Sequence, residues 1–252
     1  MNNSSNQRFQ VNLSGLIDIL ANLLYTGPHV YLRELLQNSM DAIQARLAEG
    51  NQVRGEIHIE LIESESGPPT LVFEDNGIGL TLTEIESFLA TVGQSSKKQL
   101  LHRQVDFIGQ FGIGLLSCFM VCDEIVVITR SAKEGSPSLK WTGKADGTYE
   151  IVELDKETAV GTQVFVRAKE MANEYFEPGF VKKTLSRFGQ YLDTEILFEF
   201  NGNRSRINTI PLWELFDEQD PSTYERVLDL AAQQMGEEFI DVFPISSSAG
   251  TV

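Results

Sequence analysis

Residues 106–114, DFIGQFGIG, place three glycines directly before an apolar run, residues 115–121, that suits a helix or a strand. Glycine has no Cβ and tolerates positive φ, so the backbone can turn sharply and bring its N–H groups close to a ligand. A helix that begins straight after such a loop adds its own unpaired N–H groups and its positive dipole end. The stretch therefore predicts an anion-binding loop, and phosphate is the usual anion for such a loop.

The chain of 252 residues is long enough for one large domain and part of a second. Its formal charge of −16 argues against a nucleic-acid partner, because nucleic-acid phosphates require basic surfaces. A nucleotide remains compatible with this charge, since long-range repulsion is screened over about 8 Å at physiological salt. No apolar run approaches the roughly 20 residues that a membrane-spanning helix needs, and the N-terminus does not resemble a signal peptide.

The two cysteines, Cys118 and Cys122, fall four residues apart on the helix expected after the glycine loop. We interpret them as small buried apolar side chains rather than as a disulfide or a metal site. Unpaired cysteines are typical of a reducing compartment, so we expect the protein in the cytoplasm.

Apolar periodicity predicts helices over residues 13–25, 30–48, 178–191 and 222–235, and alternation predicts strands over 56–61, 70–74, 124–130, 161–167 and 195–200. A weaker strand pair is expected within 141–152, and residues 67–69 are expected to form a turn. Thr81 and Glu84 form a capping-box pattern, which predicts that a further helix begins there. We expect an α+β fold, a two-layer sandwich in which a mixed, mostly antiparallel sheet of about eight strands has helices on one face. The pattern changes after residues 201–203, so we expect one domain over 1–205 and the start of a second over 206–252.

Three further polar clusters are candidates for chemistry. Glu34, Asn38 and Asp41 share one face of the 30–48 helix, opposite Leu36 and Leu47, which also fits an ordinary solvated surface. Asp75 ends a strand and is followed by Gly77 and Gly79, as suits a buried acceptor beside a tight turn, although surface Asp-Asn-Gly turns are frequent. Gly161 and Thr162 open a strand, which taken alone indicates only a turn.

In this order, the clusters resemble the ATPase superfamily of gyrase, histidine kinases and mismatch-repair proteins. The forms GQFGIGLLS at 109–117, YLREL at 31–35 and VVIT at 126–129 are similar to the ninety-kilodalton heat-shock chaperones of bacterial type. The resemblance covers roughly residues 8–200, implies a Bergerat-type ATP-binding fold, and continues weakly into what looks like the start of that family's middle domain.

The resemblance implies a role for each residue of these motifs. Asp75 would accept the adenine amine, Gly79 would let the backbone close on the ring, and Thr162 would support Asp75 through water. Asn38 would be the single protein ligand of Mg²⁺, and Glu34 would be the general base that activates the attacking water. The remaining expected contacts to ATP or ADP are Asp41, Gln110, Phe111, Gly112, Ile113 and Gly114.

The chain departs from the family pattern at two positions. A basic residue expected in the lid over residues 91–110 is Gln94, with Lys97 or Lys98 as a substitute, and an expected Asn is Phe88. The family's middle domain supplies an arginine for hydrolysis, so we expect these residues alone to bind ATP and ADP but to turn ATP over slowly.

Three readings of the function follow. The first is the ATP-binding domain of a chaperone whose partners are client proteins and which forms a homodimer through a C-terminal region. The second is a degenerate module that binds nucleotide without turnover. The third is a histidine-kinase-like ATPase domain, which the form of the 109–114 loop disfavours.

Overall fold

The computed structural model describes residues 27–64, 67–88, 114–209, 220, 222–241, 246–247 and 250–251. The expected helix over 13–25, the lid over 91–110 and the loop residues 110–113 lie outside the described residues. Chain contacts divide the protein into two compact units, residues 1–207 and 208–252, and the sheet and the motifs belong to the first.

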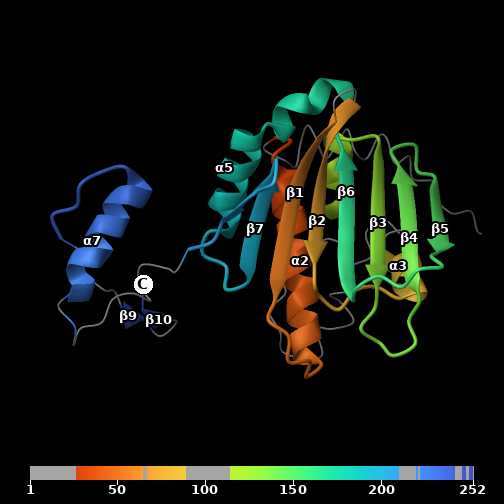
Figure 1. Ribbon diagram of the computed structural model, residues 1–252, viewed down its shortest axis with the longest axis horizontal. Coiled ribbons are helices and arrows are strands. Elements are labelled where there is room, and N and C mark those ends of the chain that lie inside the picture. The colour runs from red at the N-terminus through yellow and green to blue at the C-terminus, as the bar shows by residue number, and fades with distance from the viewer. Residues whose placement is uncertain are drawn as a thin grey trace, which may run out of the picture. The chain divides into compact units, whose positions relative to one another are not determined.

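The first unit is built on one eight-stranded sheet with the order β5-β4-β3-β6-β2-β1-β7-β8 (Figure 1). Its only parallel pair is β1 with β7, and every other neighbouring pair is antiparallel, as the sequence predicts. The strands are β1 (Glu56–Ser64), β2 (Gly67–Asp75), β3 (Glu124–Arg130), β4 (Ser138–Lys144), β5 (Tyr149–Glu153), β6 (Gly161–Arg167), β7 (Glu195–Phe200) and β8 (Asn203–Arg206).

The core lies between one face of this sheet and the helices α2 (Val30–Ala48) and α5 (Pro178–Gly189). Because side chains alternate along a strand, Ile57, Ile59 and Leu61 of β1 are buried on this face, while the residues between them point the other way. Figure 1 shows the sheet in front of α2, so the view is onto the face that α2 does not cover. The α+β sandwich expected from the sequence is confirmed.

Helix α2 is more deeply buried than its sequence indicates. Nine of its 19 residues are buried, and they include two polar ones: Asp41, on the face that we interpreted as possibly solvated, and Ser39, which lies outside that face. Leu47, expected on the apolar face, is 45% exposed because it lies at the end of the helix beyond the core. Asp41 on this polar face therefore packs inside the domain, whereas Asn38 on the same face is exposed.

Three local predictions need correction. Residues 67–69 are the first part of β2 rather than a turn; the Pro69 carbonyl accepts from the Ala168 N–H (2.9 Å), and a proline is tolerated at the start of a strand. The sequence analysis missed β8, which the left-handed residues Asn201 and Gly202 join to β7 in a tight hairpin. The helix after the glycine loop is a 3₁₀ helix, η2 (Gly114–Met120), with Cys118 and Cys122 buried and free as expected.

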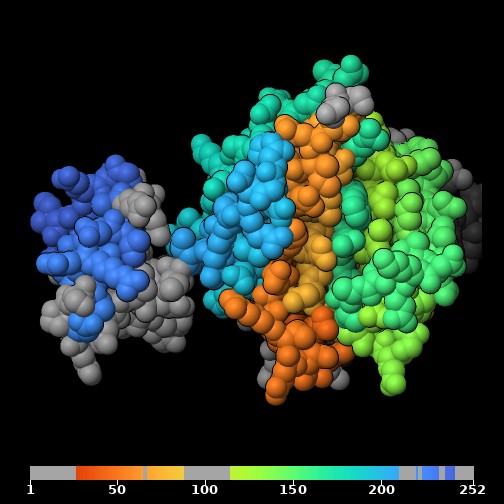
Figure 2. All heavy atoms as spheres, viewed as in Figure 1, coloured from red at the N-terminus to blue at the C-terminus, as the bar shows by residue number. Residues whose placement is uncertain are grey.

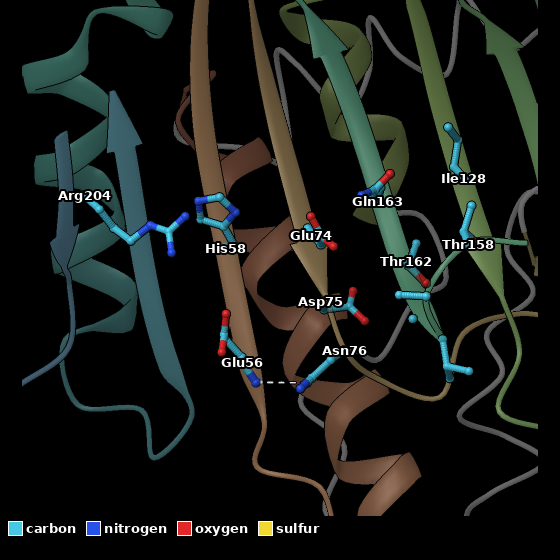
Figure 3. A pocket seen from close by; sticks show the side chains of 13 residues that line it. Glu56, His58, Glu74, Asp75, Asn76, Ile128, Thr158, Thr162, Gln163 and Arg204 are labelled. Carbon is cyan, nitrogen blue, oxygen red and sulfur yellow. Dashed lines mark hydrogen bonds between the residues drawn. The ribbon is translucent and has the colours of Figure 1, made fainter. Parts of the chain in front are cut away.

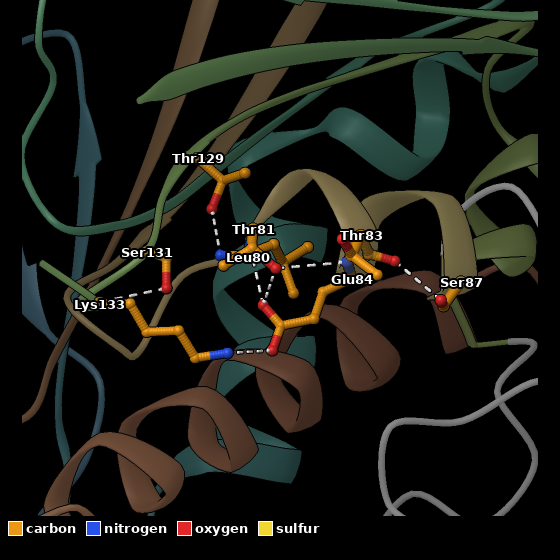
Figure 4. Close-up of polar contacts among 8 residues, drawn as sticks. All are labelled: Leu80, Thr81, Thr83, Glu84, Ser87, Thr129, Ser131 and Lys133. Atoms are coloured by element: carbon orange, nitrogen blue, oxygen red, sulfur yellow. Dashed lines mark hydrogen bonds and ion pairs between the residues drawn. The ribbon is translucent and has the colours of Figure 1, made fainter. Parts of the chain in front are cut away.

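The short helix α3 (Leu82–Phe88) begins with the predicted capping box, shown in Figure 4. The Thr81 N–H donates to Glu84 Oε2 (2.8 Å), and the Glu84 N–H donates to Thr81 Oγ1 (3.4 Å). Lys133 Nζ lies 3.0 Å from the other oxygen of Glu84, which ties α3 to the segment after β3. Among the described residues of the first unit, the remaining helix is the 3₁₀ helix η3 (Glu170–Phe176). The described part of the second unit contains α7 (Ser222–Met235) and the short strands β9 (Ser246–Ser247) and β10 (Gly250–Thr251).

Candidate functional site

Asp75, the last residue of β2, is a buried carboxylate whose bonds come from three directions. Its Oδ1 accepts the N–H of Gly77 (2.9 Å), the Ser39 hydroxyl of α2 donates to it, and the Thr162 amide of β6 stabilises its charge. Asp75 is only 7% exposed, and this burial raises its pKa to about 7 despite the three bonds, with the nearby Glu74 carboxylate adding a smaller upward effect. Asp75 is therefore a hydrogen-bond acceptor that is held in a fixed position where α2 meets the sheet.

The loop that follows Asp75 is held against α2. A Cβ on Gly77 would lie 2.5 Å from the Cβ of Ala42, so only glycine fits here, and the Ile78 N–H donates to the Ala42 carbonyl (2.9 Å). One turn further along the helix, Nη1 of Arg46 donates to the carbonyl of Asn76 (2.6 Å). These contacts fix the position of the Asp-x-Gly-x-Gly motif relative to the helix that carries Glu34 and Asn38.

Two other glycines bring the ends of β2, β3 and β6 together. Gly79 has a φ of 66° and lies so close to the carbonyl of Arg130 that a side chain would clash with it. Gly161, with a φ of 134°, approaches the carbonyl of Asp75 in the same way. Glycine is therefore required at both positions for steric reasons, in addition to any contact with a ligand.

A single hydroxyl connects these three strands. Oγ1 of Thr129 accepts the Leu80 N–H (3.0 Å), as Figure 4 shows. It also donates to the carbonyl of Gly161 (2.9 Å) and lies 3.1 Å from Oγ1 of Thr162. Thr162 pairs with Asp75 across β6 and β2 and with Thr129 across β6 and β3. The structure therefore connects Thr162 to Asp75 through its backbone, while its hydroxyl bonds to Thr129.

Glu34, on the first half of α2, faces the end of the glycine loop. A Cβ on Gly114 would lie 2.5 Å from Oε2 of Glu34, and the other oxygen of Glu34 lies 2.6 Å from Nη2 of Arg33. The Glu34 side chain is 14% exposed, whereas that of Arg33 is 44% exposed. The guanidinium of Arg33 thus holds one carboxylate oxygen of Glu34, and the other oxygen faces Gly114, the last residue of the predicted anion-binding loop.

Asn38 lies one turn after Glu34, and its side chain is exposed, while Asp41 is buried. Within the described ranges, no group of three or more His, Cys, Asp or Glu side chains could hold a metal ion. Mg²⁺ commonly binds through one or two protein oxygens together with phosphate oxygens and water. The single accessible amide oxygen of Asn38 fits that mode, in which the nucleotide supplies the remaining ligands.

The structure thus gathers the described motif residues around one helix. Asp75, Gly77 and Ile78 contact the second half of α2, Gly114 contacts the first half, and Thr162 is paired with Asp75. Of the predicted site, Gln110, Phe111, Gly112 and Ile113 lie outside the described residues, as do Gln94, Lys97 and Lys98.

Four residues of this arrangement were missed by the sequence analysis: Arg33, Ser39, Arg46 and Thr129. Arg33 and Ser39 are each next to a predicted residue in the sequence, and that adjacency was the available signal. Thr129 ends the VVIT motif of the family resemblance, which did not indicate the contacts of its hydroxyl, and Arg46 gave no signal because its partner Asn76 is distant in the sequence.

A cavity of about 250 Å³ opens on the opposite face of the sheet (Figure 3). Figure 2 shows this face, where strands rather than α2 form most of the surface in view. His58, Glu74 and Gln163 line the cavity, and they alternate with the residues that face α2. Next to it, Glu199 accepts from both His58 (3.1 Å) and Arg204 (2.8 Å). Asp75, Gly161 and Thr162 of the motif site also line this cavity, at the ends of β2 and β6, whereas Glu34, Asn38 and Gly114 do not.

Comparison with known proteins agrees with this arrangement. Residues 25–165 match the family described as histidine kinase-, DNA gyrase B- and HSP90-like ATPase. The chain is 31% identical to the chaperone protein HtpG of Geobacter metallireducens over 209 residues, which cover 77% of this chain and 32% of that protein. It is also 31% identical to the mitochondrial heat shock protein 75 kDa of Rattus norvegicus over 232 residues, which cover 88% of this chain and 32% of that protein.

A third relative is the mitochondrial TNF receptor-associated protein 1 homolog of Dictyostelium discoideum, 31% identical over 223 residues that cover 82% of this chain and 30% of that protein. The chain thus spans about a third of the length of the curated relatives that it matches. In the part of the chain that the structure describes, no helix is both long enough and apolar enough to cross a membrane. The matched family and these relatives favour the chaperone reading over the histidine-kinase-like and degenerate alternatives. The chain belongs to the histidine kinase-, DNA gyrase B- and HSP90-like ATPase family, as an ATP-binding domain of the HtpG type.

Proposed function

We propose that ATP and ADP bind across the middle of α2, between the Asp75 loop and Gly114. The observation that carries this proposal is the convergence of separate motifs on one helix: Asp75 beside Ser39, Gly77 against Ala42, and Gly114 against Glu34. Adenine presents an amine donor where guanine presents an acceptor, so a buried carboxylate at Asp75 selects adenine. A buried acceptor left without its donor costs about 1–3 kcal/mol, which sets the scale of the selectivity.

The phosphates extend from the base toward Gly114. The amides of residues 110–114 donate to them, and Asn38, with Asp41 on the same helix, completes the contacts on the side of α2. Asn38 would hold Mg²⁺ together with the phosphates and water, and the ion would supply positive charge beside the transferring phosphate. The fit of Asn38 to this role rests on its exposed side chain, one turn from Glu34.

Glu34 is the general base of hydrolysis in this proposal. Its carboxylate faces Gly114, so a water beside the terminal phosphate lies within its reach. It orients that water and takes its proton, a contribution that is typically about 10²–10⁴-fold in rate. Arg33 holds the other oxygen of Glu34 and thereby fixes the direction of the carboxylate.

The whole protein is proposed to be an ATP-driven chaperone with client proteins as partners. The support is the names of its relatives, which include chaperones and heat shock proteins about three times longer than the matched region. Residues 208–252, the second compact unit, are proposed to begin a middle domain. A homodimer is proposed to form through a C-terminal region. A cytoplasmic location is also proposed, and the free buried cysteines support it.

Thermal melting with and without Mg²⁺-ADP tests nucleotide binding. A ligand that binds only the folded state at 100 times its dissociation constant stabilises it by about 2.7 kcal/mol. For a domain of this size we expect the midpoint to rise by roughly 5–10 °C. Mg²⁺-GDP at the same concentration is the control. An equal rise with both nucleotides contradicts base recognition by Asp75, and no rise with ADP contradicts the proposed function.

A further inference from the structure

Arg46 stands outside the catalytic and phosphate-binding groups discussed above, yet its side chain reaches the loop after β2. It lies in the last turn of α2, where a basic residue commonly interacts with the helix dipole. The end of this helix is already served by other groups: the N–H groups of Glu49 and Gly50 bond its carbonyls, and Nδ2 of Asn51 donates to the carbonyl of Arg46. The guanidinium points instead to Asn76, with Nη1 2.6 Å from its carbonyl oxygen.

The bond to Asn76 acts on one particular peptide group. The carbonyl of Asn76 and the N–H of Gly77 belong to the same planar peptide unit, so they cannot rotate independently. Arg46 holds the carbonyl end, while the N–H end donates to Oδ1 of Asp75 (2.9 Å). If this peptide turned over, both bonds would break together. A donor on the carbonyl also polarises the peptide and strengthens the bond made by its N–H.

The side chain of Asn76 is already fixed on the other side of the loop. Its Nδ2 donates to the carbonyl of Arg54 (2.8 Å), and its Oδ1 accepts the N–H of Glu56 (2.9 Å). Arg46 therefore adds what these bonds do not supply, which is the orientation of the carbonyl. Burying a cation is costly unless it is well paired, and Nε of Arg46 is buried without a hydrogen-bond partner in the described part of the chain. The bond to the Asn76 carbonyl is the described interaction that offsets this cost.

We propose that Arg46 is a positioning residue for base recognition: by holding the Asn76 carbonyl, it fixes the peptide whose N–H keeps the Asp75 carboxylate in place for the nucleotide base. This inference rests on the proposed function, because it assigns Arg46 to the same site. Its test can be separated from that function, since the bond between Gly77 and Asp75 exists in the protein without nucleotide.

The first experiment is an NMR titration of the Asp75 carboxyl carbon in the nucleotide-free chain and in Arg46→Met. The N–H of Gly77 is the strongest of the groups that lower the pKa of Asp75. Its partial loss raises that pKa, so we expect the titration midpoint of Arg46→Met to lie above that of the parent chain. The neighbours on α2 and β6 that bond Asp75, Ser39 and Thr162, are neutral, and the charged neighbour Glu74 is unchanged.

The matched control is Arg54→Met. Its side chain is 77% exposed and pairs with Glu195, while its backbone carbonyl bonds the same Asn76. This variant removes one positive charge beside the same loop without touching the peptide, so the midpoint of Asp75 stays at its parent value. An equal midpoint shift in both variants, or no shift in Arg46→Met, overturns the proposal. If Arg46→Met does not fold, Arg46→Gln replaces it under the same criteria.

The second experiment measures ADP affinity by calorimetry. Loss of a hydrogen bond to a charged donor that orients a binding group predicts a weakening of about tenfold in Arg46→Met. Arg46→Lys restores part of this loss because it returns a charged donor to the carbonyl, and Arg54→Met binds like the parent chain. Unchanged ADP affinity in Arg46→Met overturns the proposal. Absence of ADP binding in the parent chain itself contradicts the proposed function and leaves the titration to decide the role of Arg46.

Discussion

Gly114 and Glu34 are so close that a Cβ on the glycine would lie 2.5 Å from Oε2 of the carboxylate. The contact joins the end of the glycine loop to the first half of α2, and it leaves no room for a side chain between the proposed base and the proposed phosphate site. Gly114→Ala therefore displaces the Glu34 carboxylate, whose flexible end yields more easily than backbone. A misplacement of about 1 Å can cost about 10²-fold in rate, so we expect ATP turnover to fall by that order while ADP affinity is kept.

Steady-state turnover and calorimetry on Gly114→Ala separate these two effects. Gly179→Ala is the control, because a Cβ there meets no atom within 4 Å. Unchanged turnover in Gly114→Ala would show that the position of Glu34 does not limit the reaction.

Substitutions of Glu34 and Asp75 are expected to affect different quantities, ATP turnover for Glu34 and nucleotide affinity for Asp75. Glu34→Ala removes the proposed base and should lower turnover by about 10²–10⁴-fold, with ADP affinity close to that of the parent chain. Asp75→Asn replaces an acceptor-only carboxylate with an amide, and it should weaken ADP binding itself. Calorimetry with ADP on both variants makes the comparison, and equal losses of affinity would refute the separate roles.

The raised pKa of Asp75 predicts opposite effects of pH on stability and on binding. Its folded-state pKa is about 7 against the ordinary value of 3.8 for an aspartic acid, so between these values the folded protein retains a proton that the unfolded chain has released. The free energy of unfolding therefore decreases as pH rises from about 4 to about 7, with a limit of about 4 kcal/mol for this one group. Adenine binding should instead strengthen as pH rises through about 7, because the charged carboxylate is the better acceptor.

Urea unfolding and calorimetry across this pH range measure the two effects. Adenosine is the suitable probe for binding, since it has no phosphate that titrates near neutral pH. Asp75→Asn is the control, and both pH dependences should be weaker in it. A free energy of unfolding that decreases by the same amount in both proteins over this pH range would place the titrating group elsewhere.

Much of the fold could be predicted because its signals are local. Strand β7 was predicted at its observed bounds, since a short run rich in apolar and aromatic residues that ends at Asn201 and Gly202 needs no distant information. The capping box of α3 is likewise a contact between near neighbours. The hairpin to β8 was missed although Asn201 and Gly202 signal it, because the strand beyond is short and polar.

The interior contacts of the site could not be predicted in the same way. Arg46 looks like an ordinary residue at a helix end, and only the folded chain brings it to Asn76. Asp41 appeared to lie on a solvated face, and its burial depends on how α2 is rotated against the sheet. Apolar periodicity predicts the rotation of α2 about its axis only approximately, because several polar residues lie at the border of its apolar face.

Thr129 should be a main source of stability for the three strand ends that frame the site. Its hydroxyl bonds to Leu80, Gly161 and Thr162 and is almost fully buried at 1% exposure. Thr129→Val keeps the shape but leaves the Leu80 N–H and the Gly161 carbonyl without this partner, at a cost of about 1–3 kcal/mol. We expect the melting midpoint to fall by roughly 2–12 °C.

Thr129→Ser is the matched variant, since it retains the hydroxyl and removes one methyl group. It should lie much closer to the parent chain than Thr129→Val does. The reverse order would mean that packing of the methyl group, rather than the hydrogen bonds, stabilises this junction.

The opposite face of the sheet provides a final contrast. His58, Glu199 and Arg204 form a cluster beside the cavity there, and the side chain of His58 points away from α2, although Asp75 and Thr162 line the same cavity. Glu199→Gln weakens both of the ion pairs in this cluster. Since surface pairs of this kind contribute little, we expect ADP affinity to match the parent chain in calorimetry. A loss of affinity in Glu199→Gln comparable to that in Asp75→Asn would show that the base-binding strands respond to the outer face, and the site could then no longer be assigned to the face of α2 alone.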